Sequence, residues 1–113
     1  MAAVQTVVQA INDPRRREIL ELIRNRELAA GEIAARFDVT RPAISQHLTV
    51  LKNAGLVNER RDGARRLYRA RPEGLAELRA FLDGFWDERL DKLKAEAEKE
   101  QRRGRVARAA KRN

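Results

Sequence analysis

One stretch of sixteen residues constrains the fold of this chain more than any other. It spans residues 40–55 and reads TRPAISQHLTVLKNAG. Thr40 suits a helix N-cap because its hydroxyl can accept a hydrogen bond from a first-turn amide. Gly55 supplies the left-handed residue that commonly closes a helix. Apolar residues recur between these ends at helical spacing, which predicts a buried stripe. They are Ile44, Leu48 and Leu51.

The remaining surface of this predicted helix is polar or basic and holds no carboxylate. It comprises Arg41, Ser45, Gln46, Thr49, Lys52 and Asn53. Hydroxyl and amide groups suit the edges of DNA bases, and cationic groups suit phosphates. We therefore expect Ser45, Gln46 and Thr49 to read bases, while Arg41 and Lys52 contact the DNA backbone. The stretch is typical of a DNA-recognition helix.

Two helices are expected on its N-terminal side. The first is amphipathic, with an apolar face made of Val4, Val7, Val8 and Ile11. It ends before Pro14, because the residue that precedes a proline disfavours helix. Asp13 then caps the second helix, with Pro14 at its first position. Residues 15–17 are all arginine, and their charge opposes the macrodipole at this end. They indicate either a solvated face or contact with phosphates or a carboxylate.

Residues 30–37 predict a short helix, although Ala29 and Ala30 stand where a Ser or Thr N-cap is usual. Asp38 can adopt the left-handed conformation that a tight turn requires. Together with the helix of residues 40–55, this segment predicts a helix-turn-helix.

A β-hairpin is expected after Gly55. Residues 56–61 and 65–71 have strand character and flank Asp62-Gly63, a strong two-residue turn signal. Four arginines crowd the tip: Arg60, Arg61, Arg65 and Arg66. A basic ribbon directly after a recognition helix is typical of a wing that reaches a phosphate or the minor groove beside it. The alternative is a plain hairpin whose charges protect a sheet edge.

Pro72 is expected to open a long last helix with a wide apolar stripe. The stripe comprises Leu75, Leu78, Phe81, Leu82, Phe85, Trp86, Leu90, Leu93 and Ala97. Such a face exceeds what a small monomer leaves uncovered. We expect a homodimer built on Leu78, Leu82, Phe85, Trp86 and Leu90, with Val4, Val7 and Val8 added from the first helix. Packing of the last helix on the first within one chain is the alternative.

Charge is concentrated in two segments. The chain has 113 residues and a formal net charge of +8. Residues 41–71 hold eight basic and two acidic residues, and residues 99–113 hold seven basic and one acidic. This distribution is typical of a nucleic-acid binder. We expect residues 1–98 to form one DNA-binding and dimerisation domain, and residues 99–113 to form a flexible basic tail.

The sequence offers little for catalysis or metal binding. It contains no cysteine and one histidine, His47, for which we expect a packing or phosphate-contact role. One imidazole without matched ligands makes no metal site. Ser45 and His47 are two apart on a helix and point away from each other, so no catalytic triad is formed. We predict no enzyme, no cofactor and no metal site. No signal peptide or membrane-spanning run is found, so a cytoplasmic protein is expected.

The order of these elements resembles the ArsR/SmtB family of bacterial winged-helix repressors. Three stretches carry the resemblance: NDPRRREILELI (12–23), ELAAGEIAARFDVTRPAISQHLTVLKNAGLV (27–57) and RRDGARRLYRA (60–70). The resemblance implies a homodimer that binds an inverted repeat in its promoter region and blocks transcription until a signal releases it.

The chain departs from that family's metal-sensing members. Where those members carry Cys-x-Cys, this sequence has Ala29, Ala30 and Gly31 after Glu27-Leu28. The last helix has carboxylates but no histidine, which other metal-binding members use there. We therefore expect a metal-independent, autoregulatory repressor. The alternatives are a non-specific architectural DNA-binding protein and a winged-helix module that binds proteins.

Overall fold

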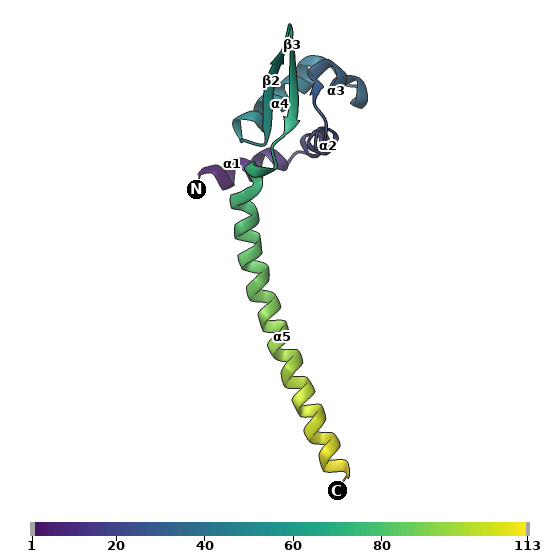
Figure 1. Cartoon of the computed structure of the whole chain (residues 1–113), viewed down its shortest axis with the longest axis vertical. Coiled ribbons are helices and arrows are strands. Elements are labelled where there is room, and N and C mark those ends of the chain that lie inside the picture. Colours follow the sequence, from purple (N-terminus) through teal and green to yellow (C-terminus); the bar gives the residue numbers. More distant parts are fainter. Residues whose placement is uncertain (1, 113) are drawn as a thin grey trace. The chain divides into compact units, whose positions relative to one another are not determined.

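The computed structural model describes the backbone of residues 2–112 and the side-chain surroundings of residues 4–104. The chain divides into two compact units, residues 1–78 and 79–113. The elements run in the following order (Figure 1): α1 (Ala2–Ile11), α2 (Pro14–Leu22), β1 (Leu28–Ala29), α3 (Ala30–Phe37), α4 (Arg41–Asn53), β2 (Val57–Asp62), β3 (Arg65–Ala70), the 3₁₀ helix η1 (Pro72–Leu75) and α5 (Ala76–Arg112). The mainly helical fold with a small antiparallel sheet agrees with the sequence prediction.

The core of the first unit is made by aliphatic side chains from α1, α2, α3, α4, the sheet and the residues that adjoin them. The fully buried ones are Ile19, Ile23, Ile33, Ile44, Leu48, Leu51 and Leu56. Each such side chain contributes about 1.5–3 kcal/mol through removal from water. The predicted stripe of α4 is thus confirmed, and it fixes which face of this helix stays exposed.

Local signals set the ends of α4 and of the preceding turn. Thr40 Oγ1 accepts the Ala43 amide at 3.3 Å, which confirms the predicted cap. Asp38 has φ +53° and Gly55 has φ +76°, so both take the left-handed conformation as predicted. The N-terminus of α3 lacks a side-chain cap from Ala29, also as predicted. Instead, the Ala29 amide donates to Glu32 Oε1 at 3.0 Å.

The sheet has one strand more than the predicted hairpin. Its order is β1-β3-β2, with β3 central and both pairings antiparallel. Leu28 pairs with Tyr68 and Ala29 with Leu67, so the segment before α3 closes one edge of the hairpin. Two residues are too short a run for a periodic strand signal, which explains why the sequence did not predict β1.

The hairpin turn lies one residue later than predicted. Asp62 pairs with Arg65, so the two turn residues are Gly63 and Ala64, and Asp62 belongs to β2. Gly63 is therefore the first turn residue, and its φ of +64° is a conformation that glycine adopts without strain. The strands end within one residue of the predicted ranges.

The last helix also begins later than predicted. Pro72 opens the short η1 helix, and α5 begins at Ala76. The helix then runs through Arg112, across the expected domain limit at residue 98. Among the described residues, each helix is too short or too polar to span a membrane.

Candidate nucleic-acid interface

The exposed face of α4 holds the residues that the sequence singled out. Arg41, Ser45, Gln46, Thr49, Lys52 and Asn53 are all exposed, on the sides and back of the helix around the buried stripe. The Thr49 hydroxyl donates to the Ser45 carbonyl oxygen at 2.9 Å, so its proton is already used within the helix. The hydroxyl oxygen can still accept a hydrogen bond, and the methyl group can contact a thymine methyl.

Val50 is a part of this face that sequence reasoning missed. Its side chain is 40% exposed, in contrast to the buried Leu48 and Leu51. The available signal was its position outside the helical spacing of the stripe. An exposed aliphatic side chain beside Gln46 adds apolar contact to an otherwise polar surface.

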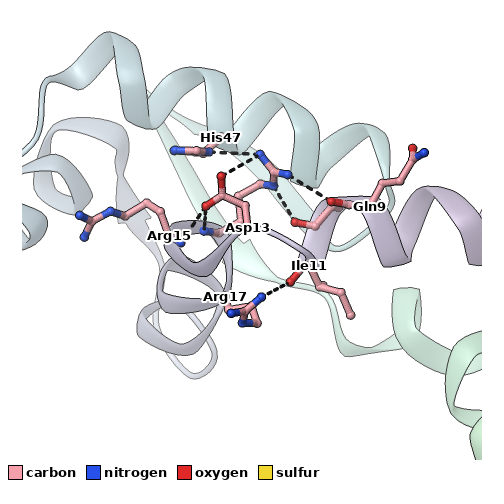
Figure 2. Close-up of polar contacts among 8 residues, drawn as sticks. Gln9, Ile11, Asp13, Arg15, Arg17 and His47 are labelled. Atoms are coloured by element: carbon pink, nitrogen blue, oxygen red, sulfur yellow. Dashed lines mark hydrogen bonds and ion pairs between the residues drawn. The ribbon is translucent and has the colours of Figure 1, made fainter.

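His47 lies beside α2 rather than on the exposed face. Its Nδ1 is 3.4 Å from Nη1 of Arg16, and its side chain is partly buried (Figure 2). This position favours the packing alternative for His47 over the phosphate-contact alternative.

Arg16 joins three elements. Its Nε donates to the Ala10 carbonyl at 2.6 Å, and Nη2 donates to the Gln9 carbonyl at 3.1 Å (Figure 2). Nη1 also lies 3.7 Å from Asp13 Oδ2. The guanidinium therefore satisfies carbonyls at the C-terminal end of α1, where a positive charge is favourable.

The neighbouring arginines of α2 are engaged as well. Arg17 Nη1 donates to the Ile11 carbonyl at 2.7 Å, and the Arg15 guanidinium lies 5.0 Å from the centre of the Phe37 ring. The macrodipole conflict noted in the sequence thus has a tertiary explanation: two of these three side chains cap α1, and the third covers an aromatic ring.

Asp13 caps α2 as predicted. Its Oδ1 accepts the amides of Arg15 at 2.8 Å and Arg16 at 3.3 Å. Burial acts to raise the pKa of Asp13, but these two amides and the charges of Arg16 and His47 outweigh it and hold that pKa below its ordinary value.

Most basic side chains of the wing are ion-paired with carboxylates. Arg60 makes two hydrogen bonds to Glu27, at 2.9 and 3.0 Å, and Arg65 pairs with Glu32. The hydrogen bond from Arg60 is the main cause that lowers the pKa of Glu27. These acidic partners lie more than thirty residues away in sequence, and sequence reasoning missed them.

Glu59 pairs with two cations at once. Lys52 Nζ lies 3.2 Å from Oε2, and Arg66 Nη1 lies 3.5 Å from Oε1. Burial raises the pKa of the nearby Tyr68, and the charge of Glu59 adds to that rise. Of the arginines and the lysine predicted to contact the DNA backbone, Arg41 and Arg61 have no carboxylate partner within the described part of the chain.

Comparison with known proteins decides the family. Residues 13–59 match the bacterial regulatory protein, arsR family. The HTH-type transcriptional regulator Rv2034 of Mycobacterium tuberculosis is 51% identical over 82 residues, which cover 73% of this chain and 77% of that protein. The chain belongs to the arsR family.

This arsR-family chain is also similar to a second curated protein and to a solved structure. The transcriptional repressor SdpR of Bacillus subtilis is 42% identical over 60 residues, covering 53% of this chain and 67% of that protein. A solved structure is described as the homodimeric winged helix-turn-helix DNA-binding domain of a possible ArsR-family regulator, Mb0332 of Mycobacterium bovis. It is 36% identical, has a TM-score of 0.63, and is matched over 77% of this chain and 81% of that one. The fold of this arsR-family regulator is therefore a winged helix-turn-helix, and its relatives are regulators rather than enzymes.

The residues predicted for the dimer surface fall into two groups. Val7 is 3% exposed and belongs to the core of its own protomer, so its side chain has no free surface for a partner. Leu78 packs against the same core. The others are exposed in part or in full: Val4, Val8, Leu82, Phe85, Trp86 and Leu90.

The second unit of this arsR-family chain exposes large aromatic residues along α5. Phe81 is 66% exposed, Phe85 is 64% exposed and Trp86 is 57% exposed. Leu82, Leu90 and Leu93 extend the same surface, which we call the α5 apolar face. Within the described residues, no group of three or more His, Cys, Asp or Glu side chains is placed to hold a metal ion.

Proposed function

We propose that this arsR-family regulator is a transcriptional repressor that binds an inverted-repeat operator as a homodimer. The observation that carries the proposal is the exposed face of α4, which offers hydrogen-bonding and cationic side chains without a carboxylate. A major groove of B-DNA admits such a helix, and the β2–β3 wing supplies cations for the adjoining backbone. The similarity to a repressor of Bacillus subtilis supports repression rather than activation.

In this proposal Ser45, Gln46 and Thr49 read bases. The backbone contacts come from α4 and the wing: Arg41, Lys52, Arg60, Arg61, Arg65 and Arg66. Arg41 and Arg61 meet phosphates directly, because no carboxylate within the described residues competes for them. The remaining four either give up a carboxylate partner for a phosphate or share their charge between the two.

In this proposal the α5 apolar face holds the homodimer, and Val4 and Val8 of α1 contribute further contact surface. Exposed aromatic residues of this number are costly in water, and a second copy of the same chain would cover them. The homodimeric Mycobacterium bovis domain supports this assembly. A two-fold axis places two recognition helices about 34–36 Å apart or a multiple of it, so the operator is an imperfect palindrome.

Residues 1–98 form the DNA-binding and dimerisation part in this proposal, and residues 99–113 add non-specific attraction to DNA. Seven of those last fifteen residues are basic. Charge of this kind strengthens binding to every sequence and weakens as salt rises.

Repression is proposed to be independent of metal ions. The chain has no cysteine and one histidine, and selective binding of zinc or softer metals needs several thiolate or imidazole ligands. Titration of zinc, cadmium or arsenite into the protein–operator complex should change its dissociation constant less than about threefold. Stoichiometric release by any of these would contradict metal independence while leaving the repressor proposal standing.

Selection of bound duplexes from a random pool tests the main proposal. We expect an enriched palindromic motif, protection of that motif in footprints, and lower reporter expression when the motif lies in a promoter. Binding without an enriched motif would indicate a non-specific architectural protein. No salt-dependent DNA binding would indicate a protein-interaction module. Higher reporter expression would make the chain an activator.

A further inference from the structure

Glu59 differs from the other carboxylates that pair with the wing, because it has two cationic partners. Glu27 and Glu32 each hold one arginine, whereas Glu59 holds Lys52 of α4 and Arg66 of β3. One carboxylate thus connects the last turn of the recognition helix to the second strand of the wing.

Glu59 is also the most shielded carboxylate of these three. Its side chain is 20% exposed, compared with 31% for Glu27 and 49% for Glu32. Because Glu59 lies opposite Tyr68 in the β2–β3 ladder, the strand pairing fixes its position. Its two cationic partners are about half exposed, so their charged ends remain accessible from solvent.

We propose that Glu59 is a specificity-determining positioning residue for DNA binding. It fixes the Lys52 ammonium relative to the Arg66 guanidinium. It thereby weakens their binding to phosphates that are not positioned as they are on the operator. This inference rests on the proposed function, since it requires that Lys52 and Arg66 meet phosphates of an operator.

The physical argument concerns competition for the same cations. A cation that is held by a carboxylate gains less from a phosphate than a free one, because the ion pair must first be given up or shared. On an operator, the base contacts of α4 hold the protein in one register relative to the phosphates. Cations that are already fixed in position then meet these phosphates with little loss of side-chain freedom. On random DNA no such register exists, so the carboxylate lowers affinity there more than on the operator.

Glu59→Gln and Glu59→Asp test this inference with different charges. Glutamine keeps the shape and removes the charge. Aspartate keeps the charge but is one methylene shorter, so it cannot reach both partners as Glu59 does. Glu21→Gln is the matched control, because Glu21 of α2 forms an exposed pair with Arg24, which follows the helix, and its loss changes net charge equally. Dissociation constants are measured for the selected operator duplex and for a scrambled duplex over a range of salt concentrations.

For Glu59→Gln we expect affinity for scrambled DNA to rise and the salt slope to steepen by about one unit. The ratio of scrambled to operator dissociation constants should fall by about three- to tenfold. The ratio should also fall for Glu59→Asp and stay unchanged for Glu21→Gln. In a Lys52→Met, Arg66→Met background, Glu59→Gln should have no further effect on the ratio.

An unchanged ratio in Glu59→Gln or, if that variant does not fold, in Glu59→Asp would overturn the inference. Equal loss of the ratio in Glu21→Gln would also overturn it, because net charge alone would then suffice. The wild-type chain is measured first. If it shows no preference for any selected duplex, the proposed function fails, which is distinct from failure of the inference about Glu59.

Discussion

Arg16 Nη1 lies 3.4 Å from His47 Nδ1, which joins the second helix to the recognition helix. The same guanidinium donates to two carbonyls at the end of α1. One guanidinium of α2 therefore contacts both α1 and the recognition helix α4. Its side chain is only 17% exposed, so solvent screens these contacts little.

Replacement of Arg16 by Met should destabilise the fold by about 2 kcal/mol, because the α1 carbonyls lose a charged donor. Arg24→Met is the control, since the exposed side chain of Arg24 pairs with the exposed Glu21, and loss of this pair should cost about 0.5 kcal/mol or less. Urea unfolding followed by circular dichroism gives both values. Equal losses for the two variants would show that the capping contacts contribute nothing.

The Asp13 cap makes stability depend on pH in a defined direction. The pKa of Asp13 is lowered in the folded protein from its ordinary value of 3.8. The folded state therefore binds fewer protons than the unfolded state, and the contribution of this carboxylate is complete above that value. It is lost as the pH falls below it, through the lowered pKa. Asp13→Asn should flatten the fall in unfolding free energy between about pH 5 and pH 3, measured by urea titration. A wild-type slope retained in Asp13→Asn would assign the effect to other carboxylates.

Gln46 is predicted to read a base. Gln46→Ala should cost about 1–3 kcal/mol on the selected operator and relax preference at one base position. Gln5→Ala, the same change at an exposed position of α1, should leave the motif and affinity unaltered. Repeated selection with each variant measures the motif. An unchanged motif for Gln46→Ala would remove Gln46 from the base-reading set.

Arg61 and Arg60 should differ although they are neighbours in β2. Arg60 is bound to Glu27 by two hydrogen bonds, whereas Arg61 has no carboxylate partner among the described residues. Arg61→Gln should weaken binding to all duplexes and lower the salt slope by about one unit. Arg60→Gln should change the slope by less, since Glu27 already neutralises Arg60. Fluorescence anisotropy at several salt concentrations separates the two, and identical slopes would show that the ion pair opens without cost.

Trp86 is predicted to anchor the homodimer. Trp86→Glu places a charge on the α5 apolar face and should give a monomer with reduced operator affinity. Ala80→Glu makes the same charge change at an exposed position that lies outside this apolar face, and it should leave the dimer intact. Sedimentation at micromolar concentration reports the mass of each. A wild-type chain that sediments as a monomer would refute the dimer.

The helix-turn-helix and the exposed face of α4 could both be predicted from the amino-acid sequence. The reason is that the Thr40 cap, the left-handed Asp38 and the apolar spacing around Leu48 act within a few residues of each other. Local backbone preference and helical periodicity are enough to decide such features.

Which basic side chains are paired with a carboxylate could not be predicted in this way, because the partners are brought together by the tertiary fold. Arg60 meets Glu27 across thirty-three positions, and Arg16 meets His47 across thirty-one. These pairs arise because β3 lies between β1 and β2 and because α2 packs on α4. A count of basic residues records four arginines at the wing, but it cannot record that three of them face carboxylates brought there by the fold.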